Sequence, residues 1–181
     1  NGIVLNDVQT ESGGKFATQL FAIWELDDCP LKVSFIEDNY VGMFPQKAIS
    51  FIGTDIPTES LDGLYHRKLR TVTGMTQGDI PTGGRQAARD LFDLYCLDCS
   101  HMTIPGFIDY INKLGANFPE KAFSAGLGAM SWLDLMDQFS EIDYTPEAAQ
   151  KYNIPDKEQI MGAVRKRMQD VFKEVTSHGA H

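Results

Sequence analysis

The sequence predicts a mainly α fold, a single helix-rich globular domain of about six to eight helices with a small β element in the N-terminal third. Two observations predict it. Apolar residues recur at helical spacing through most of residues 55–176, with capping residues and glycines near the ends of several stretches. Residues 31–35 instead alternate apolar and polar side chains, which is typical of a strand. A chain of 181 residues can bury one substantial core, so we expect residues 1–181 to form one domain.

Residues 1–54 are the part where the patterns conflict. Residues 15–26 fit both the helical and the strand period. Phe16, Leu20 and Ile23 share one face of a helix, which favours a helix there. A β-hairpin that turns through residues 27–30 is the alternative, and residues 45–52 are similarly ambiguous. We therefore expect a mixed segment that includes the strand at residues 31–35.

The rest of the chain reads as helical up to residue 176, followed by a frayed tail at residues 177–181. The patterns predict helices over residues 58–74, 84–98, 103–115, 118–139, 145–152 and 156–175. The third has agreeing signals, with Thr103 as its cap, Pro105 in its first turn and Gly115 at its end. The fourth is apolar or small nearly all round, which predicts burial. Gly126 and Gly128 within it predict a kink or the close passage of another backbone.

The composition argues against several classes of partner. A net charge of −9 and a pI of about 4.8 would repel a phosphate backbone, so we expect no nucleic-acid binding. No window approaches the roughly 20 consecutive apolar residues of a membrane-spanning helix, and no signal peptide is visible. Three cysteines are an odd number, which disfavours a disulfide framework and favours a reducing, cytoplasmic location.

The segment at residues 95–101, YCLDCSH, is the first candidate for chemistry. Cys96 and Cys99 are three residues apart on one helical face, and His101 adds a nitrogen ligand. A structural zinc site needs four ligands and a catalytic site needs three. Cys29 or His66 is the candidate for a fourth, and nothing in the sequence places either nearby. The predicted helix ends at the pair, where its dipole raises the thiol pKa. We therefore expect ordinary thiols at a helix end and no cofactor; a zinc site, or a redox site, is the alternative.

Anion binding is the second candidate. Backbone amides and the positive end of the dipole at a helix start can hold a phosphate or carboxylate. The spacing matches neither a P-loop nor a dinucleotide-binding loop. We therefore expect a solvated helix face and an ordinary capped helix start here, and an anion site is the alternative. The candidate residues come from a basic cluster in one helix and from the start of the next: Arg67, Lys68, Arg70, Gly83, Gly84, Arg85 and Arg89.

An acidic stripe is the third candidate. Asp134, Asp137 and Glu141 recur on one helical face, with Asp143 just beyond. Carboxylates in such a row can hold a hard cation. Neither an EF-hand loop nor the Glu-x-x-His pairs of a di-iron bundle accompany them. We expect a solvated helix face here.

The last helix is the candidate for contact with another protein. Methionine and basic side chains flank its apolar stripe, as in helices that dock into a groove or a second subunit. The candidate residues are Met161, Arg165, Lys166, Arg167 and Met168. More often, such a helix closes its own domain.

Nucleophilic catalysis lacks a recognisable motif, because no G-x-S-x-G elbow is present. The leading hypothesis is therefore a non-catalytic structural, assembly or protein-binding subunit that associates with a protein partner or with itself. The alternatives are a thiol- or zinc-dependent enzyme or redox sensor that uses Cys96, Cys99 and His101, and a binder of a small anionic ligand.

Overall fold

The structure, a computed structural model, describes residues 4–11, 19–26, 29–36, 42–51, 53–73, 76–77, 80–81 and 87–178. The chain divides into two compact units, residues 1–44 and residues 45–181. Among the described residues there are seven helices and a three-stranded antiparallel sheet, together with two short strand pairs. The predicted mainly α fold with a small β element near the N-terminus is confirmed. That the whole chain forms one domain stays a prediction.

The first unit contains the three-stranded sheet, in the order β1–β2–β3. Its strands are β1 (Leu5–Glu11), β2 (Gln19–Leu26) and β3 (Cys29–Ile36), each antiparallel to the next. Leu20, Ala22 and Trp24 on β2 lie opposite Phe35, Val33 and Leu31 on β3. Because side chains of a strand alternate between faces, these six share one apolar face of the sheet.

The preference for a helix over residues 15–26 is wrong, because residues 19–26 form the strand β2. The alternative, a β-hairpin, agrees with the antiparallel pairing of β2 and β3. Its expected turn at residues 27–30 is too long, because Cys29 and Pro30 already belong to β3. The sequence fits both periods, and the cross-strand apolar pairs decide between them.

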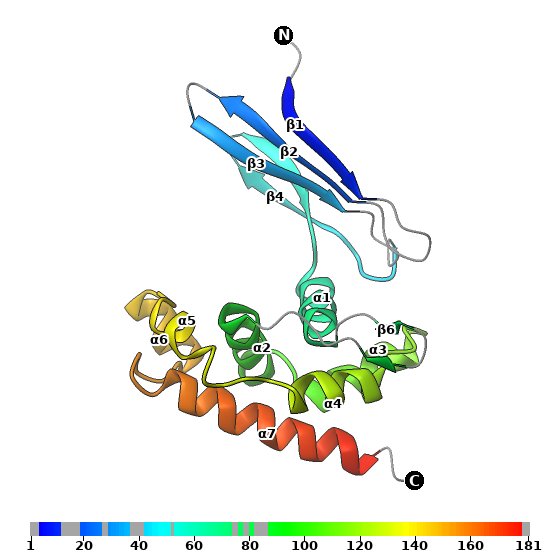
Figure 1. The fold of residues 1–181 in the computed structure, drawn as a ribbon, viewed down its shortest axis with the longest axis vertical. Coiled ribbons are helices and arrows are strands. Elements are labelled where there is room, and N and C mark those ends of the chain that lie inside the picture. The colour runs from blue at the N-terminus through cyan, green and yellow to red at the C-terminus, as the bar shows by residue number, and fades with distance from the viewer. Residues whose placement is uncertain are drawn as a thin grey trace. The chain divides into compact units, whose positions relative to one another are not determined.

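The second unit begins with a hairpin and continues with helices (Figure 1). The strand pairs are β4 (Lys47–Phe51) with β5 (Thr54–Thr58), and β6 (Thr76–Gln77) with β7 (Ile80–Pro81). The helices are α1 (Leu61–Thr73), α2 (Ala88–Ser100), α3 (Ile104–Lys113), α4 (Glu120–Gly128), α5 (Met136–Ser140), α6 (Pro146–Tyr152) and α7 (Ile160–His178). None of them combines the length and hydropathy that crossing a lipid bilayer requires.

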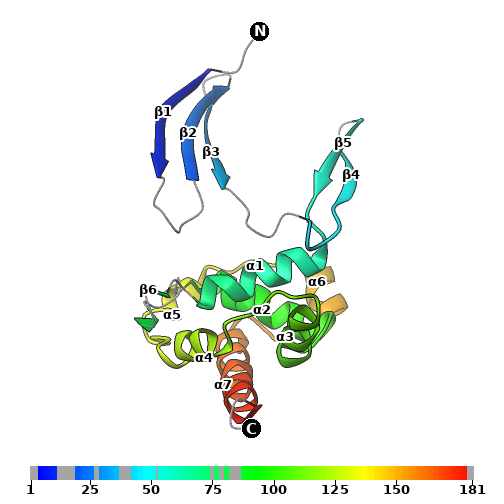
Figure 2. The same ribbon diagram turned by 90° about the vertical axis from the view of Figure 1, so that its right-hand side faces the viewer.

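The core of the second unit lies between these helices. α1 packs against α2 and α4, as Figure 2 shows. α7 lies across α2, α3, α4 and α5. It buries the apolar stripe that the sequence predicts: Ile160, Val164, Met168, Val171 and Val175. The last helix therefore closes its own fold.

Local signals set most of the helix ends. Thr103 accepts a hydrogen bond from the amide of Gly106, and Gly115 has a φ of +90° just beyond α3. At α1 the predicted cap is wrong. Thr58 belongs to β5, and the hydroxyl of Ser60 accepts the hydrogen bond from the amide of Gly63 instead. The helix predicted at residues 84–98 begins, within the described residues, at Ala88.

The helix predicted over residues 118–139 is two helices, α4 and α5, joined by turns. Leu133 in the connection is 77% exposed, so this segment is not buried all round as predicted. The predicted close passage of another backbone is present at Gly126, where an added Cβ would overlap the carbonyl oxygen of Val72 in α1. Gly128 faces the ring of Phe172 in α7. Small residues thus let α4 approach both neighbouring helices.

We predict that Gly126→Ala lowers the free energy of unfolding by about 2 kcal/mol, because the new methyl group would overlap the Val72 carbonyl. The matched control is Gly162→Ala in α7, where the added Cβ has no described heavy atom within 4 Å beyond its chain neighbours and the backbone of its own helix. This control should stabilise the protein by roughly 0.5–1 kcal/mol through helix propensity. Urea denaturation of both variants measures the difference. A Gly126→Ala variant as stable as the wild type would contradict the close approach of α4 to α1.

Candidate functional site

Lys68 links α1 to the first turns of α2. Its Nζ lies 2.7 Å from Asp90 Oδ1 and 2.6 Å from Asp93 Oδ2. Burial lowers the pKa of Lys68, but hydrogen bonds to the two carboxylates more than offset this, and the net shift is upward. Lys68 therefore stays a cation and is no general base. We call Lys68, Asp90 and Asp93 the Lys68 cluster.

A cavity of about 640 Å³ adjoins this cluster, and the two share Asp93. We call it the α2–α5 cavity. The start of α2 forms one wall, and α5 with the turn after it forms the other. Its lining residues are Ala87, Arg89, Phe92, Asp93, Gln138, Glu141, Ile142 and Asp143.

Three contacts shape the walls of the α2–α5 cavity. The side-chain oxygen of Gln138 accepts a hydrogen bond from the amide of Ala88 at 3.2 Å, which ties α5 to the start of α2. The ring of Phe92 stacks on Tyr144, with centroids 6.0 Å apart. Asp143 pairs with Lys157 at 2.7 Å. The cavity lining mixes polar and apolar side chains, and Phe92 is the one aromatic residue among its described lining residues.

Arg89 is the cation that the cavity offers to a ligand. Its side chain is exposed, lines the cavity, and forms no ion pair or hydrogen bond with the residues that the structure describes. The other anion-binding candidates differ. Arg67 pairs with Glu59 at 2.9 Å, and the charge of Lys68 is balanced by two carboxylates. Arg70 also interacts with another residue and is therefore not free. Gly83, Gly84 and Arg85 lie outside the described residues.

The thiol candidates are not brought together as a metal site. No group of three or more His, Cys, Asp and Glu residues in the described ranges is placed to hold a metal ion. His101 Nε2 instead lies 2.7 Å from Asp62 Oδ1, and the Tyr110 hydroxyl donates to Asp62 Oδ2 at 3.4 Å. One of the two ring nitrogens of His101 therefore already has a partner in α1.

Both cysteines of this segment have raised pKa values. Burial, followed by the charge of Asp93 and the neighbouring Cys99, raises the pKa of Cys96 to about 12. Burial and then Asp98 raise the pKa of Cys99. The expected direction of the shift is correct, but burial is the main cause. The remaining cysteine, Cys29, carries an exposed thiol in β3 of the other unit.

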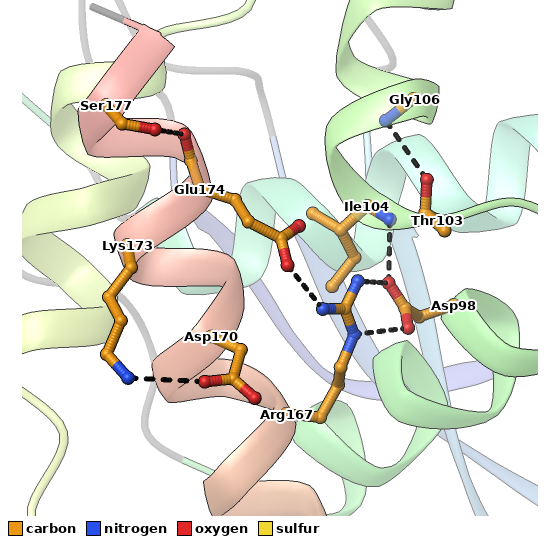
Figure 3. A network of polar contacts seen from close by, with 9 residues as sticks. All are labelled: Asp98, Thr103, Ile104, Gly106, Arg167, Asp170, Lys173, Glu174 and Ser177. Atoms are coloured by element: carbon orange, nitrogen blue, oxygen red, sulfur yellow. Dashed lines mark hydrogen bonds and ion pairs between the residues drawn. The ribbon is translucent and has the colours of Figure 1, made fainter.

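Two partner-binding candidates on α7 are used inside the fold. Met168 is buried in the apolar stripe. Arg167 donates two hydrogen bonds to the nearly buried Asp98, at 2.7 and 2.8 Å, and a third to Glu174 at 2.9 Å (Figure 3). Asp98 also accepts a hydrogen bond from the amide of Ile104 at 2.7 Å. We call these four residues the Arg167 network.

The remaining candidates on α7 keep some exposure. Met161 is half-buried, whereas Arg165 and Lys166 are exposed. They are the part of the predicted contact surface that a partner protein can still reach.

Sequence reasoning missed part of the site. Asp90 and Asp93 lie 22 and 25 residues beyond Lys68, and no local spacing joins them. No motif or spacing in the sequence marks Gln138 or Phe92 as site residues. The acidic stripe is exposed to solvent, as expected, but the sequence does not predict that Glu141 and Asp143 also line this cavity. Their position opposite α2 follows only from the packing of α5 against that helix.

We predict that Arg167→Ala lowers the free energy of unfolding by about 3 kcal/mol, because it leaves the carboxylate of Asp98 buried without its cation. The matched control is Arg165→Ala on the same helix, which should change stability by less than about 0.5 kcal/mol. Equal stability of the two variants, measured by denaturant unfolding, would contradict the Arg167 network.

We predict that Cys96 reacts with iodoacetamide at pH 8 about a hundredfold more slowly than a free thiol, because a pKa of about 12 leaves it almost entirely protonated. The rate should rise with pH as the thiolate forms. Peptide mass mapping of the native protein after timed alkylation measures it, with glutathione as the reference thiol. Alkylation of Cys96 as fast as glutathione would contradict the burial of this thiol.

No protein-family model and no curated protein matches the chain. Two solved structures resemble it at a low level. JHP933 from Helicobacter pylori is 17% identical, with a TM-score of 0.38 over 99% of this chain and 68% of that chain. A structure described as a "putative nucleotidyltransferase" from H. pylori is 18% identical, with a TM-score of 0.40 over 100% of this chain and 72% of that chain. At these identities and TM-scores, neither similarity supports a conclusion about the function of this protein.

Proposed function

We propose that the chain binds a small ligand with an anionic group in the α2–α5 cavity. The observation that carries the proposal is Arg89, an exposed guanidinium that lines the cavity and has no partner among the described residues. Arg89 is also in the first turn of α2, where the helix dipole favours a negative charge. A phosphate or carboxylate that binds here gains both interactions.

The Lys68 cluster supports this proposal by reducing the negative charge near the ligand. Asp93 is one turn from Arg89 on α2 and would repel an anion if its charge were not offset. The ammonium of Lys68, at 2.6 Å, offsets this charge in part, because Lys68 is shared with Asp90. The two stretches that the sequence offers as separate anion candidates, the basic cluster of α1 and the start of α2, are thus joined by one ion-pair cluster.

The role of a non-catalytic protein-binding or assembly subunit stays a prediction. The apolar stripe of α7, which motivated it, is buried in the chain's own core. Arg165 and Lys166 remain as exposed candidates for contact with a partner. Nothing else in the described residues favours this role over ligand binding.

We predict that inorganic phosphate, ADP or ATP raises the melting temperature by about 3 to 5 °C at ten times its dissociation constant, through the coupling of binding to folding. Arg89→Ala should remove the shift, because the ligand loses its guanidinium. Arg165→Ala, which removes an exposed arginine from α7, should preserve the shift in melting temperature. Differential scanning fluorimetry over a concentration series measures all three proteins.

The absence of any shift in the wild type at millimolar concentrations would count against binding of these anions. A shift of equal size in Arg89→Ala would mean that the anion binds outside the α2–α5 cavity.

A further inference from the structure

Beyond Arg89, the charged side chains that line the α2–α5 cavity are carboxylates: Asp93, Glu141 and Asp143. Two of them already have a cation. Asp93 pairs with Lys68 at 2.6 Å, and Asp143 pairs with Lys157 at 2.7 Å. The side chain of Glu141 is exposed and has no ion pair or hydrogen bond within the described ranges. Among the residues that the structure describes, the cavity therefore presents one unpaired cation and one unpaired anion on two different elements, together with Asp93, which shares Lys68 with Asp90.

We infer that the ligand of this cavity is a small zwitterion, with an anionic group for Arg89 and an amine for Glu141. This inference rests on the proposed function and deepens it. A plain anion gains the attraction of Arg89 but is repelled by Glu141 across the same cavity. A ligand that also carries an ammonium group gains an attraction at both positions.

The aromatic wall supports a cationic group on the ligand. Phe92 lines the cavity, and its stacking on Tyr144 fixes the ring. An ammonium group near an aromatic face gains a further attraction from the ring's quadrupole. Because Arg89 and Glu141 are both exposed, each ion pair with the ligand is screened by solvent, and the expected gain from the amine is modest.

The test compares two probes that differ only in the amine: phosphoethanolamine and ethyl phosphate. In isothermal titration calorimetry of the full chain, phosphoethanolamine should bind about three- to fivefold more tightly, the gain expected of an exposed ion pair. Glu141→Gln should abolish this advantage while ethyl phosphate binds at least as tightly as before, since a repulsive charge is removed. Glu158→Gln, at another exposed glutamate in the turn before α7, is the matched control and should preserve the advantage.

Equal affinities of the two probes for the wild type would overturn the zwitterion inference, as would an advantage that survives Glu141→Gln. In either case ethyl phosphate binding that depends on Arg89 would leave the proposed function standing. If neither probe binds, or if binding is unchanged in Arg89→Ala, the proposed function fails together with the inference.

Discussion

The carboxylate of Asp98 is the interaction on which the helical unit depends. It lies near the end of α2, accepts two hydrogen bonds from Arg167 of α7, and accepts a third from the amide of Ile104 at the start of α3. One nearly buried charge thus joins three helices. A buried carboxylate is tolerated only when its cation and its donors are in place. The Arg167 network therefore fixes the direction in which α7 crosses the core, in addition to the burial of its apolar stripe.

α2 carries a second ion-pair cluster at its other end, and the two clusters together determine which cations remain available. Lys68 is held by Asp90 and Asp93, and Arg167 by Asp98 and Glu174. Both cations therefore hold helices together and are not available to a ligand. Arg89 lies on the same helix, has no such partner in the part of the chain that the structure describes, and lines the cavity opposite α5. The proposed site depends on this difference. The charges inside the helical unit pair with one another, whereas the charge of Arg89 at the cavity can pair with a ligand.

Helices with strong local signals were predicted well, and segments with ambiguous signals were not. α3 and α7 follow from their capping residues and apolar periods, which act within a few turns of chain. Residues 19–26 fit both periods, and pairing with β1 and β3 made them a strand. Residues 118–139 are apolar enough for one buried helix. Contacts of Gly126 with α1 and Gly128 with α7 position α4, and the chain leaves the helix at Gly128.

The sequence by itself determined the mainly α class, the position of most helices, the core-facing stripe of α7 and the list of basic and acidic side chains. These depend on local propensity and periodicity, which a single sequence displays. Only the tertiary structure decided which charges neutralise one another. Lys68 meets carboxylates more than 20 residues away, His101 meets Asp62, and Arg167 meets Asp98 69 residues away. Electrostatic energy depends on distance in space, and no spacing along the chain reports that distance before the helices pack.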